Sequence, residues 1–188
     1  MRPFELRGKE RLPPLELRDK RELQRYRVFT VEQQTLARPG GGPIRDVYTM
    51  GVRDWVNVLA LTEDDELVLV WQLRFGPGEV TLETPGGVVE PGESPWDTAR
   101  RELLEETGYE AGALELLCVT EPNPALHGNR CYAFLARGCR RVGEPHGDPD
   151  EEVVVELVGA EHAERLLDEN WLRHALCRVT VLEWLRRR

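Results

Sequence analysis

The amino-acid sequence predicts an α+β fold. Its hydrophobic patterns give several strands first, then one helix with a signal at each end, then more strands and finally two helices. This order differs from the regular alternation of strand and helix in a βαβ protein. A chain of 188 residues with 40% hydrophobic residues is long enough for one domain with its own core.

The N-terminal half divides into a charged lead-in and a series of strands. Residues 1–24 are charged and interrupted by prolines, so we predict a lead-in arm of little order, or one that binds a partner. The domain itself is expected over residues 25–188. Alternating, β-branched patterns predict strands in this part of the chain at 25–36, from 47, at 56–61, at 67–73 and at 81–83.

The C-terminal half is predicted to hold three further strands and two helices. The strands are expected at 114–120, 131–136 and 153–157, with loops at 121–130 and 143–152, and the helices at about 159–169 and 171–187. The last helix carries apolar residues at helical spacing, which predicts a core or dimer face. These residues are Leu172, Leu176, Val179, Leu182 and Leu185.

Composition limits the classes of function. A net charge of −9 argues against a nucleic-acid-binding surface, although bound metal ions can still attract an anionic substrate. The four cysteines have no paired spacing and no nearby histidine cluster, so we interpret them as reduced, mostly buried thiols. No apolar run is long enough for a membrane span or a signal peptide, which predicts a cytoplasmic protein without a membrane partner.

The central helix is bounded by local signals at both ends. Ser94 is a suitable N-cap, Pro95 suits the first helical position, and Asp97 favours the positive N-terminus. Gly108 is suited to end the helix in the left-handed conformation. Before the helix, closely spaced glycines and prolines predict a tight loop with exposed backbone.

Three carboxylates share one face of this helix. Glu102, Glu105 and Glu106 have the spacing i, i+3, i+4, at which like charges repel. A positive group must offset them. Neighbouring arginines can do so in part, but Mg²⁺ or Mn²⁺ suits the hard carboxylate oxygens better. The competing interpretation is a solvated acidic face, which the caps, the loop and the spacing make a distant second.

The same stretch resembles the Nudix box, G-x5-E-x7-R-E-U-x-E-E-x-G-U, in which U is bulky and apolar. The only departure is Tyr109, at a final position where aliphatic residues are commoner. The resemblance implies an α/β/α sandwich around a mixed β-sheet. The matching residues are Gly87, Glu93, Arg101, Glu102, Leu103, Glu105, Glu106 and Gly108.

The resemblance also implies roles for individual residues. Glu102, Glu105 and Glu106 are the expected metal ligands, joined by the backbone carbonyl of Gly86. Glu93 and Arg101 are expected to hold the helix against the loop.

The general base often lies outside the box in this family. Glu151 is our first candidate for the base or a further metal ligand, followed by Glu152. For either residue, a solvated acidic loop is nearly as good an interpretation.

Two segments before the box narrow the range of expected substrates. Residues 70–75 and 82–87 resemble the Q-x-R and L-E-x-P-x-G segments of ADP-ribose pyrophosphatases and related nucleoside-diphosphate-sugar hydrolases. The resemblance implies that Arg74 contacts substrate phosphate and that Glu83 lies near the site. It also implies a homodimer, for which residues 25–50 would supply the dimer-forming strands.

We therefore expect Mg²⁺-dependent hydrolysis of the pyrophosphate bond of ADP-ribose or a related nucleoside diphosphate sugar, giving a nucleoside monophosphate and a sugar phosphate. The alternatives are hydrolysis of GDP-mannose, a dinucleoside polyphosphate or NADH, and a non-catalytic nucleotide-sensing domain. The sensor ranks lower because such domains often lose a box glutamate, and this chain keeps them all.

Overall fold

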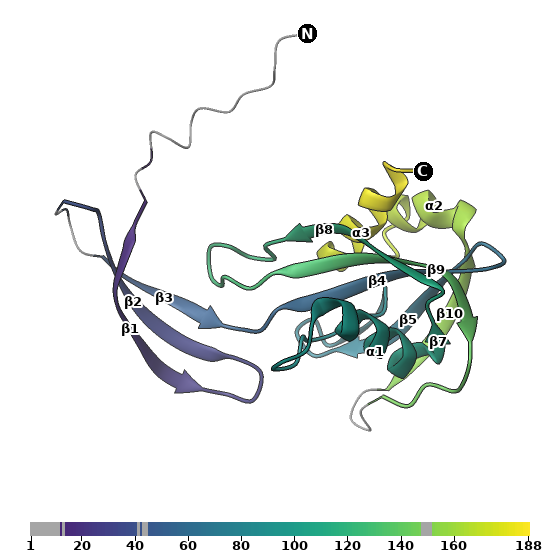
Figure 1. The fold of residues 1–188 in the computed structure, drawn as a ribbon, viewed down its shortest axis with the longest axis horizontal. Coiled ribbons are helices and arrows are strands. Elements are labelled where there is room, and N and C mark those ends of the chain that lie inside the picture. Colours follow the sequence, from purple (N-terminus) through teal and green to yellow (C-terminus); the bar gives the residue numbers. More distant parts are fainter. Residues whose placement is uncertain (1–11, 13, 41, 43–44, 148–151) are drawn as a thin grey trace, which may run out of the picture. The chain divides into compact units, whose positions relative to one another are not determined.

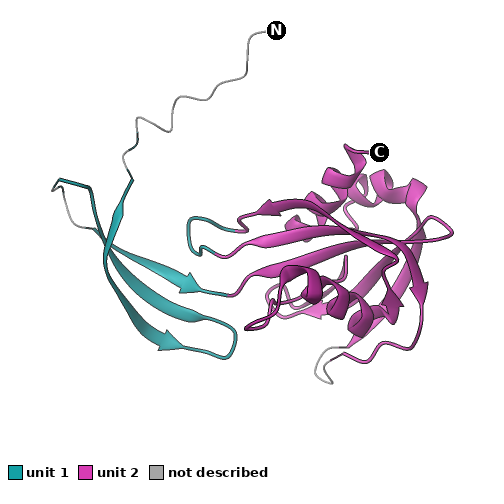
Figure 2. Cartoon of the chain, viewed as in Figure 1, with its two compact units in different colours: residues 1–52, 123–128 teal, residues 53–122, 129–188 magenta. Residues whose placement is uncertain are grey.

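The computed structural model describes residues 12, 14–40, 42, 45–147 and 152–188. The chain forms two compact units (Figure 2). One comprises residues 1–52 and 123–128, and the other residues 53–122 and 129–188.

The first unit is a three-stranded antiparallel sheet in the order β1-β2-β3 (Figure 1). Its strands are β1 (Glu16–Arg25), β2 (Thr30–Ala37) and β3 (Arg45–Gly51). Among the residues of this unit that the structure describes, Ala37 alone is buried. The sheet therefore encloses no hydrophobic core of its own.

Two features of the first unit differ from the sequence-based prediction. Residues 16–25 form strand β1, although we expected the whole of residues 1–24 to be a lead-in. The strand sequence ELRDKRELQR is almost entirely polar, so hydrophobic periodicity gives no strand signal there. In addition, the chain divides into its two units at residue 52 and not at residue 24.

The second unit is built on a mixed sheet whose main path runs β10-β5-β4-β9-β7, with β6 paired to β5 and β8 to β9. Strands β4 and β9 are parallel and the other pairs are antiparallel. The strands are β4 (Trp55–Thr62), β5 (Glu66–Arg74), β6 (Glu79–Glu83), β7 (Tyr109–Glu110), β8 (Ala113–Thr120), β9 (Cys131–Arg141) and β10 (Val153–Gly159).

Helices cover both faces of this sheet. Strand β4 places Leu59 and Leu61 in one buried cluster and Val58 and Ala60 in another, because alternate side chains point to opposite faces. Helix α1 (Pro95–Thr107) packs on the second cluster through Ala99 and Leu103. The short helices α2 (Ala163–Asp168) and α3 (Ala175–Leu185) cover the first cluster. The predicted α/β/α sandwich around a mixed sheet is confirmed.

Helix α1 has both predicted caps. The Asp97 backbone N–H donates to the Ser94 hydroxyl at 3.2 Å, and Pro95 begins the helix. Gly108 ends the helix at φ 73°, and its N–H donates to the Leu104 carbonyl at 2.8 Å. The local signals in the sequence therefore fix both ends of the helix.

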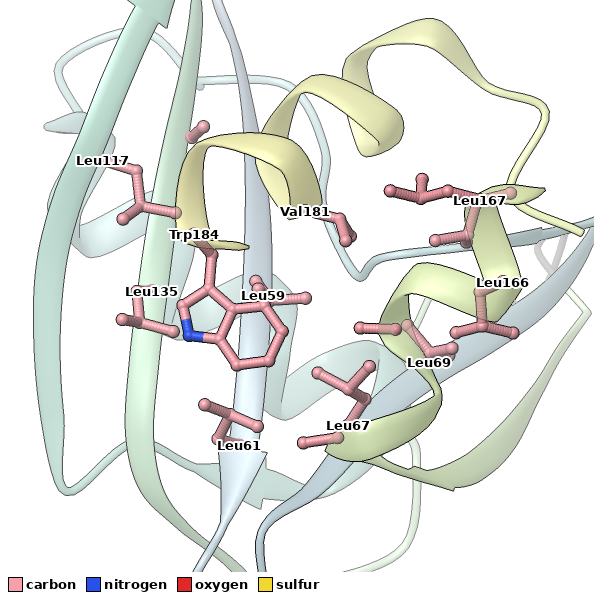
Figure 3. Close-up of a cluster of buried hydrophobic side chains, with 14 of the residues drawn as sticks. Leu59, Leu61, Leu67, Leu69, Leu117, Leu135, Leu166, Leu167, Val181 and Trp184 are labelled. Atoms are coloured by element: carbon pink, nitrogen blue, oxygen red, sulfur yellow. The ribbon is translucent and has the colours of Figure 1, made fainter. Parts of the chain in front are cut away.

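The buried face of α3 differs from the predicted face. Val181 and Trp184 point into the cluster around Leu59 (Figure 3), and Cys177 and Thr180 are also buried. Leu182, which we placed on the buried or dimer face, is 47% exposed. The helix is apolar on several sides, so its periodicity does not select one face.

None of the helices in the described residues has the length and apolar character that crossing a lipid bilayer requires.

The position of α3 gives a direct test of the core. Val181→Ala removes two buried methyl groups and should lower the free energy of unfolding by roughly 2 kcal/mol. Leu182→Ala, one residue away, should change it by less than about 0.5 kcal/mol because that side chain is exposed. Urea unfolding measures both, and a larger loss for Leu182→Ala would contradict the observed packing.

Candidate active site

The loop before α1 lies directly against strand β4. The Val58 N–H donates to the Pro85 carbonyl at 2.8 Å, and the Val56 N–H donates to the Gly87 carbonyl at 2.9 Å. A Cβ atom on Gly86 would lie 2.1 Å from the Val56 carbonyl oxygen. A Cβ atom on Gly87 would lie 2.2 Å from a carboxylate oxygen of Glu102. The backbone of β4 therefore leaves no room for a side chain at Gly86, whereas a side chain at Gly87 would displace the carboxylate of Glu102.

Arg101 is the centre of the charged network on α1. Its Nε and Nη2 atoms donate to the two carboxylate oxygens of Glu93 at 2.9 and 3.0 Å. Its Nη1 atom donates to Glu102 at 2.8 Å and to Glu105 at 2.9 Å. Nη2 also reaches the carbonyl of Val88 at 3.2 Å. One guanidinium thus ties three carboxylates to the loop that precedes the helix.

The charges in this network shift one another's pKa values. The hydrogen bonds from Arg101 lower the pKa of Glu93 to about 2, with a smaller contribution from Thr98. The hydrogen bonds of Arg101 with Glu93, together with its contacts with Glu102 and Glu105, raise the pKa of Arg101. Glu93 and Arg101 are therefore both charged at neutral pH.

Glu106 lies on the side of the helix that faces the loop. It is buried, with 4% of its surface exposed, and its carboxylate accepts a hydrogen bond from the Gly86 N–H at 2.9 Å. The carbonyls of Pro85 and Gly87 accept hydrogen bonds from β4, and Gly86 lies between them.

This cluster is suited to a divalent cation. The carboxylates of Glu93, Glu102 and Glu105 accept hydrogen bonds from Arg101, and the carboxylate of Glu106 on the same helix binds the Gly86 N–H. Their oxygens are hard donors of the kind that Mg²⁺ and Mn²⁺ prefer. The residues present thus fit such an ion, with Glu102, Glu105, Glu106 and the Gly86 carbonyl as candidate ligands.

A second charged group joins β5 to β6. Arg74 forms two hydrogen bonds with Glu83, Nε to Oε1 at 2.9 Å and Nη2 to Oε2 at 2.8 Å. Glu83 is only 2% exposed and also accepts hydrogen bonds from Thr81 and His174. Burial alone would raise the pKa of Glu83, but these donors together hold it well below its usual range.

His174 completes this group. Its Nδ1 atom lies 2.9 Å from Glu83 and 3.3 Å from the sulfur of Cys177. The contact with Cys177 and then that with Glu83 raise the pKa of His174 to about 10. The imidazole is therefore protonated on both nitrogens and positively charged at neutral pH.

Arg74, Glu83 and His174 line a cavity of about 670 Å³. The Arg74 guanidinium lies 5.8 Å from the centre of the Trp55 ring, and the Trp55 indole N–H donates to Asn57 at 2.9 Å. The cavity has the size of a small-molecule site and combines aromatic and basic walls. Its lining includes Trp55, Arg74, Phe75, Thr81, Glu83, Pro122, Asn129, Arg173 and His174.

The NUDIX domain model matches residues 52–179, which is more than half of the chain. The chain belongs to the Nudix family. The helix α1 and the loop before it, with Arg101 among the glutamates, are therefore the Nudix box of this protein.

Similarity to individual proteins agrees with this assignment. The chain is 31% identical over 127 residues to an ADP-ribose pyrophosphatase of Mycobacterium tuberculosis, which covers 66% of this chain and 60% of that protein. It is 28% identical over 167 residues to the ADP compounds hydrolase NudE of Escherichia coli, covering 86% and 88%. A crystal structure of an ADP compounds hydrolase matches with a TM-score of 0.77 and 26% identity, covering 93% of this chain and 96% of that one. The chain spans between 55% and 62% of the length of three curated relatives that it matches, the Mycobacterium tuberculosis protein among them.

The candidate base lies beyond the part of the chain that the structure describes. Glu151 falls in the gap at 148–151, while Glu152 is exposed just before β10. The described start of the same loop lies against the Nudix box. The His146 N–H donates to the Glu105 carbonyl at 2.8 Å, and the Val142 N–H donates to the Gly108 carbonyl at 2.8 Å.

Two residues of the cavity group were missed in the sequence. The sequence shows no histidine cluster near the cysteines, but one histidine, His174, contacts Cys177 at 3.3 Å. The signal was present, because His and Cys three positions apart share one side of a helix. Their common partner Glu83 lies 91 residues before His174, so only the fold brings the three together.

The network around Arg101 predicts a specific effect on metal binding. Arg101→Lys keeps the positive charge but cannot bridge Glu93, Glu102 and Glu105 with a planar fork. It should weaken Mn²⁺ binding about 10- to 100-fold, measured by titration calorimetry. Arg100→Lys, in the neighbouring exposed residue, is the matched control and should leave the affinity unchanged. Equal affinities for both variants would show that Arg101 does not position the carboxylates.

Proposed function

We propose that this protein is a Mg²⁺-dependent pyrophosphohydrolase acting on ADP-ribose or a related nucleoside diphosphate sugar. The products would be a nucleoside monophosphate, AMP in the case of ADP-ribose, and a sugar phosphate. The observation that carries the proposal is the carboxylate cluster of the Nudix box, in which Arg101 gathers glutamates that fit a divalent ion. The names of the relatives with ADP-ribose and ADP-compound activities support the substrate class.

The metal site and the cavity have complementary tasks in this proposal. Mg²⁺ bound by Glu102, Glu105, Glu106 and the Gly86 carbonyl would supply neutralisation of phosphate charge and acidification of a water molecule. Arg101 holds Glu102 and Glu105 in place, and the Gly86 N–H orients Glu106. The protein thus places its ligands before any substrate arrives.

Arg74 is the proposed contact to a substrate phosphate. Glu83 holds its guanidinium through two hydrogen bonds, so the side chain enters the cavity wall in one orientation. Burial opposes the rise in the pKa of Arg74, but the hydrogen bonds and the charge of Glu83 raise it, with a smaller contribution from Glu106. An arginine held at the cavity wall is suited to clamp a pyrophosphate.

Trp55 supplies an aromatic wall of the same cavity. An indole ring beside an arginine suits the planar, anionic parts of a nucleotide.

Glu151 is the proposed general base, with Glu152 as the second candidate. The attacking water must lose a proton, and a carboxylate on the loop at 143–152 can accept it. The support is the contact of His146 with the backbone of Glu105, which brings the described start of this loop to the box.

We further propose that the protein acts as a homodimer. The first unit is a sheet with almost no buried residue and with large apolar side chains that are at least 41% exposed. Sheets of this kind need a partner surface to bury their apolar residues. A second copy is the proposed partner. The exposed residues include Leu15, Leu17, Leu23, Tyr26, Val28 and Tyr48.

A substrate panel tests the proposed reaction. With Mg²⁺, AMP should form fastest from ADP-ribose when the panel also contains GDP-mannose, UDP-glucose, NADH, diadenosine polyphosphates and nucleoside triphosphates. Glu105→Gln should lower the rate at least about 100-fold because a metal ligand is lost. Glu110→Gln, in an exposed residue after the box, should retain the wild-type rate.

Three results would change this account. Faster cleavage of another panel member would keep the mechanism and replace the substrate. Tight binding without cleavage would favour a sensor. Full activity of Glu105→Gln would remove the metal assignment.

Sedimentation tests the dimer. The wild-type chain should sediment at twice its mass of 21.5 kDa. Leu17→Asp places a charge on the exposed apolar surface of β1 and should shift the protein towards the monomer. Leu157→Asp, an equivalent change on β10 in the other unit, should remain dimeric. A monomeric wild type, or the same response in both variants, would contradict the proposal.

A further inference from the structure

Three different metal-binding side chains converge beside the cavity. Glu83 Oε2 and His174 Nδ1 are 2.9 Å apart, His174 Nδ1 and Cys177 Sγ are 3.3 Å apart, and Cys177 Sγ and Glu83 Oε2 are 3.8 Å apart. Glu83 and Cys177 are buried, and both Glu83 and His174 line the cavity. The three atoms therefore form a small triangle with one side accessible from the cavity.

The arrangement is unlike a catalytic relay. In a nucleophile–histidine–acid relay the imidazole joins its two partners through different ring nitrogens. Here both Glu83 and Cys177 contact the same nitrogen, Nδ1. Three ligand atoms around one point can share a proton or a metal ion.

The distances fit a metal of the size of zinc. With bonds of about 2.0 Å to nitrogen and oxygen and about 2.3 Å to sulfur, tetrahedral geometry separates neighbouring ligand atoms by roughly 3.3–3.6 Å. The observed separations of 2.9, 3.3 and 3.8 Å lie on both sides of this range. Side-chain shifts of about 0.4 Å would produce the coordination geometry.

The surroundings support two of the ligands, Cys177 and Glu83, in their metal-binding forms. The Thr84 hydroxyl lies 3.3 Å from the sulfur of Cys177, and the Asn57 amide nitrogen lies 3.9 Å from it, so two donors face a developing thiolate. Arg74 and Thr81 hold the Glu83 carboxylate. Each carboxylate oxygen has two acceptor positions, so Arg74 can remain on Oε2 while a metal occupies the other position. Such outer hydrogen bonds orient ligands in known metal sites.

We propose that Glu83, His174 and Cys177 form a Zn²⁺ site distinct from the carboxylate cluster of α1. The mixed oxygen, nitrogen and sulfur donors favour Zn²⁺ over Mg²⁺, which prefers oxygen alone. The metal takes the place of the protons on Nδ1 and Sγ, and those protons go to the solvent. Its fourth position faces the cavity, where water or an anionic oxygen of a ligand completes the coordination.

Cobalt substitution tests this site in the full chain. After treatment with a chelator, Co²⁺ is added in a mildly alkaline, reducing buffer that contains excess Mg²⁺ to occupy the oxygen-only site. One equivalent of Co²⁺ should produce a thiolate charge-transfer absorption and the visible bands of tetrahedral Co²⁺, and Zn²⁺ should abolish both. An oxygen-only site gives no thiolate absorption, so the readout does not depend on hydrolysis.

Variants identify the ligands. Cys177→Ser should lose the thiolate absorption, and His174→Gln should reduce the affinity for Co²⁺ at least about 10-fold. Cys118→Ser, in a cysteine outside the group, is the control and should behave as the wild type. Circular dichroism checks that each variant is folded. If Cys177→Ser does not fold, the Co²⁺ affinity of His174→Gln tests whether this group binds the metal. Absence of a thiolate absorption in the wild type, or its persistence in Cys177→Ser, would overturn the proposal.

Discussion

The contact of Arg101 with several carboxylates is the interaction on which the candidate active site depends. Without a cation among them, Glu93 in the loop and Glu102 and Glu105 on the helix would repel one another and weaken the contact of the helix with the loop. The guanidinium also binds the Val88 carbonyl, so the same side chain fixes the distance between helix and loop. A side chain at Gly87 would displace the Glu102 carboxylate from this network. The charge balance of the cluster and the path of the loop beside it therefore both depend on the position of the Arg101 guanidinium.

The sheet of the second unit supplies the other half of the site. Strands β5 and β6 are antiparallel, with Arg74 opposite Glu79 and Val70 opposite Glu83, and the Arg74 side chain binds the buried Glu83 carboxylate at the cavity wall. The N-terminus of α3 brings His174 to the same carboxylate from a segment far along the chain. The cavity therefore combines contributions from strands that lie before the Nudix box and from a helix that follows it. Separating a buried carboxylate from its hydrogen-bond donors costs free energy. Glu83 therefore holds these strands and the helix together.

Local signals were sufficient for part of this structure. Helix α1 was predicted to its ends because Ser94 and Gly108 are caps whose effect needs no tertiary contact. The apolar strands of the second unit were also located, since their patterns reflect burial. Strand β1 was missed because its side chains are polar and its pairing with β2 is made by the backbone. The face of α3 was misplaced because apolar residues surround that helix, and only contact with the sheet selects Val181 and Trp184. The Glu83–His174–Cys177 group depends on tertiary structure, which spacing alone does not provide.

The central claim is that the carboxylates gathered by Arg101 bind a divalent metal. Anomalous diffraction from crystals soaked in Mn²⁺ tests it most directly, because the manganese position is seen independently of any activity. The account predicts anomalous density bounded by the carboxylates of Glu102, Glu105 and Glu106 and the Gly86 carbonyl. Manganese bound only elsewhere, with the Arg101 network intact and its carboxylates unligated, would contradict it.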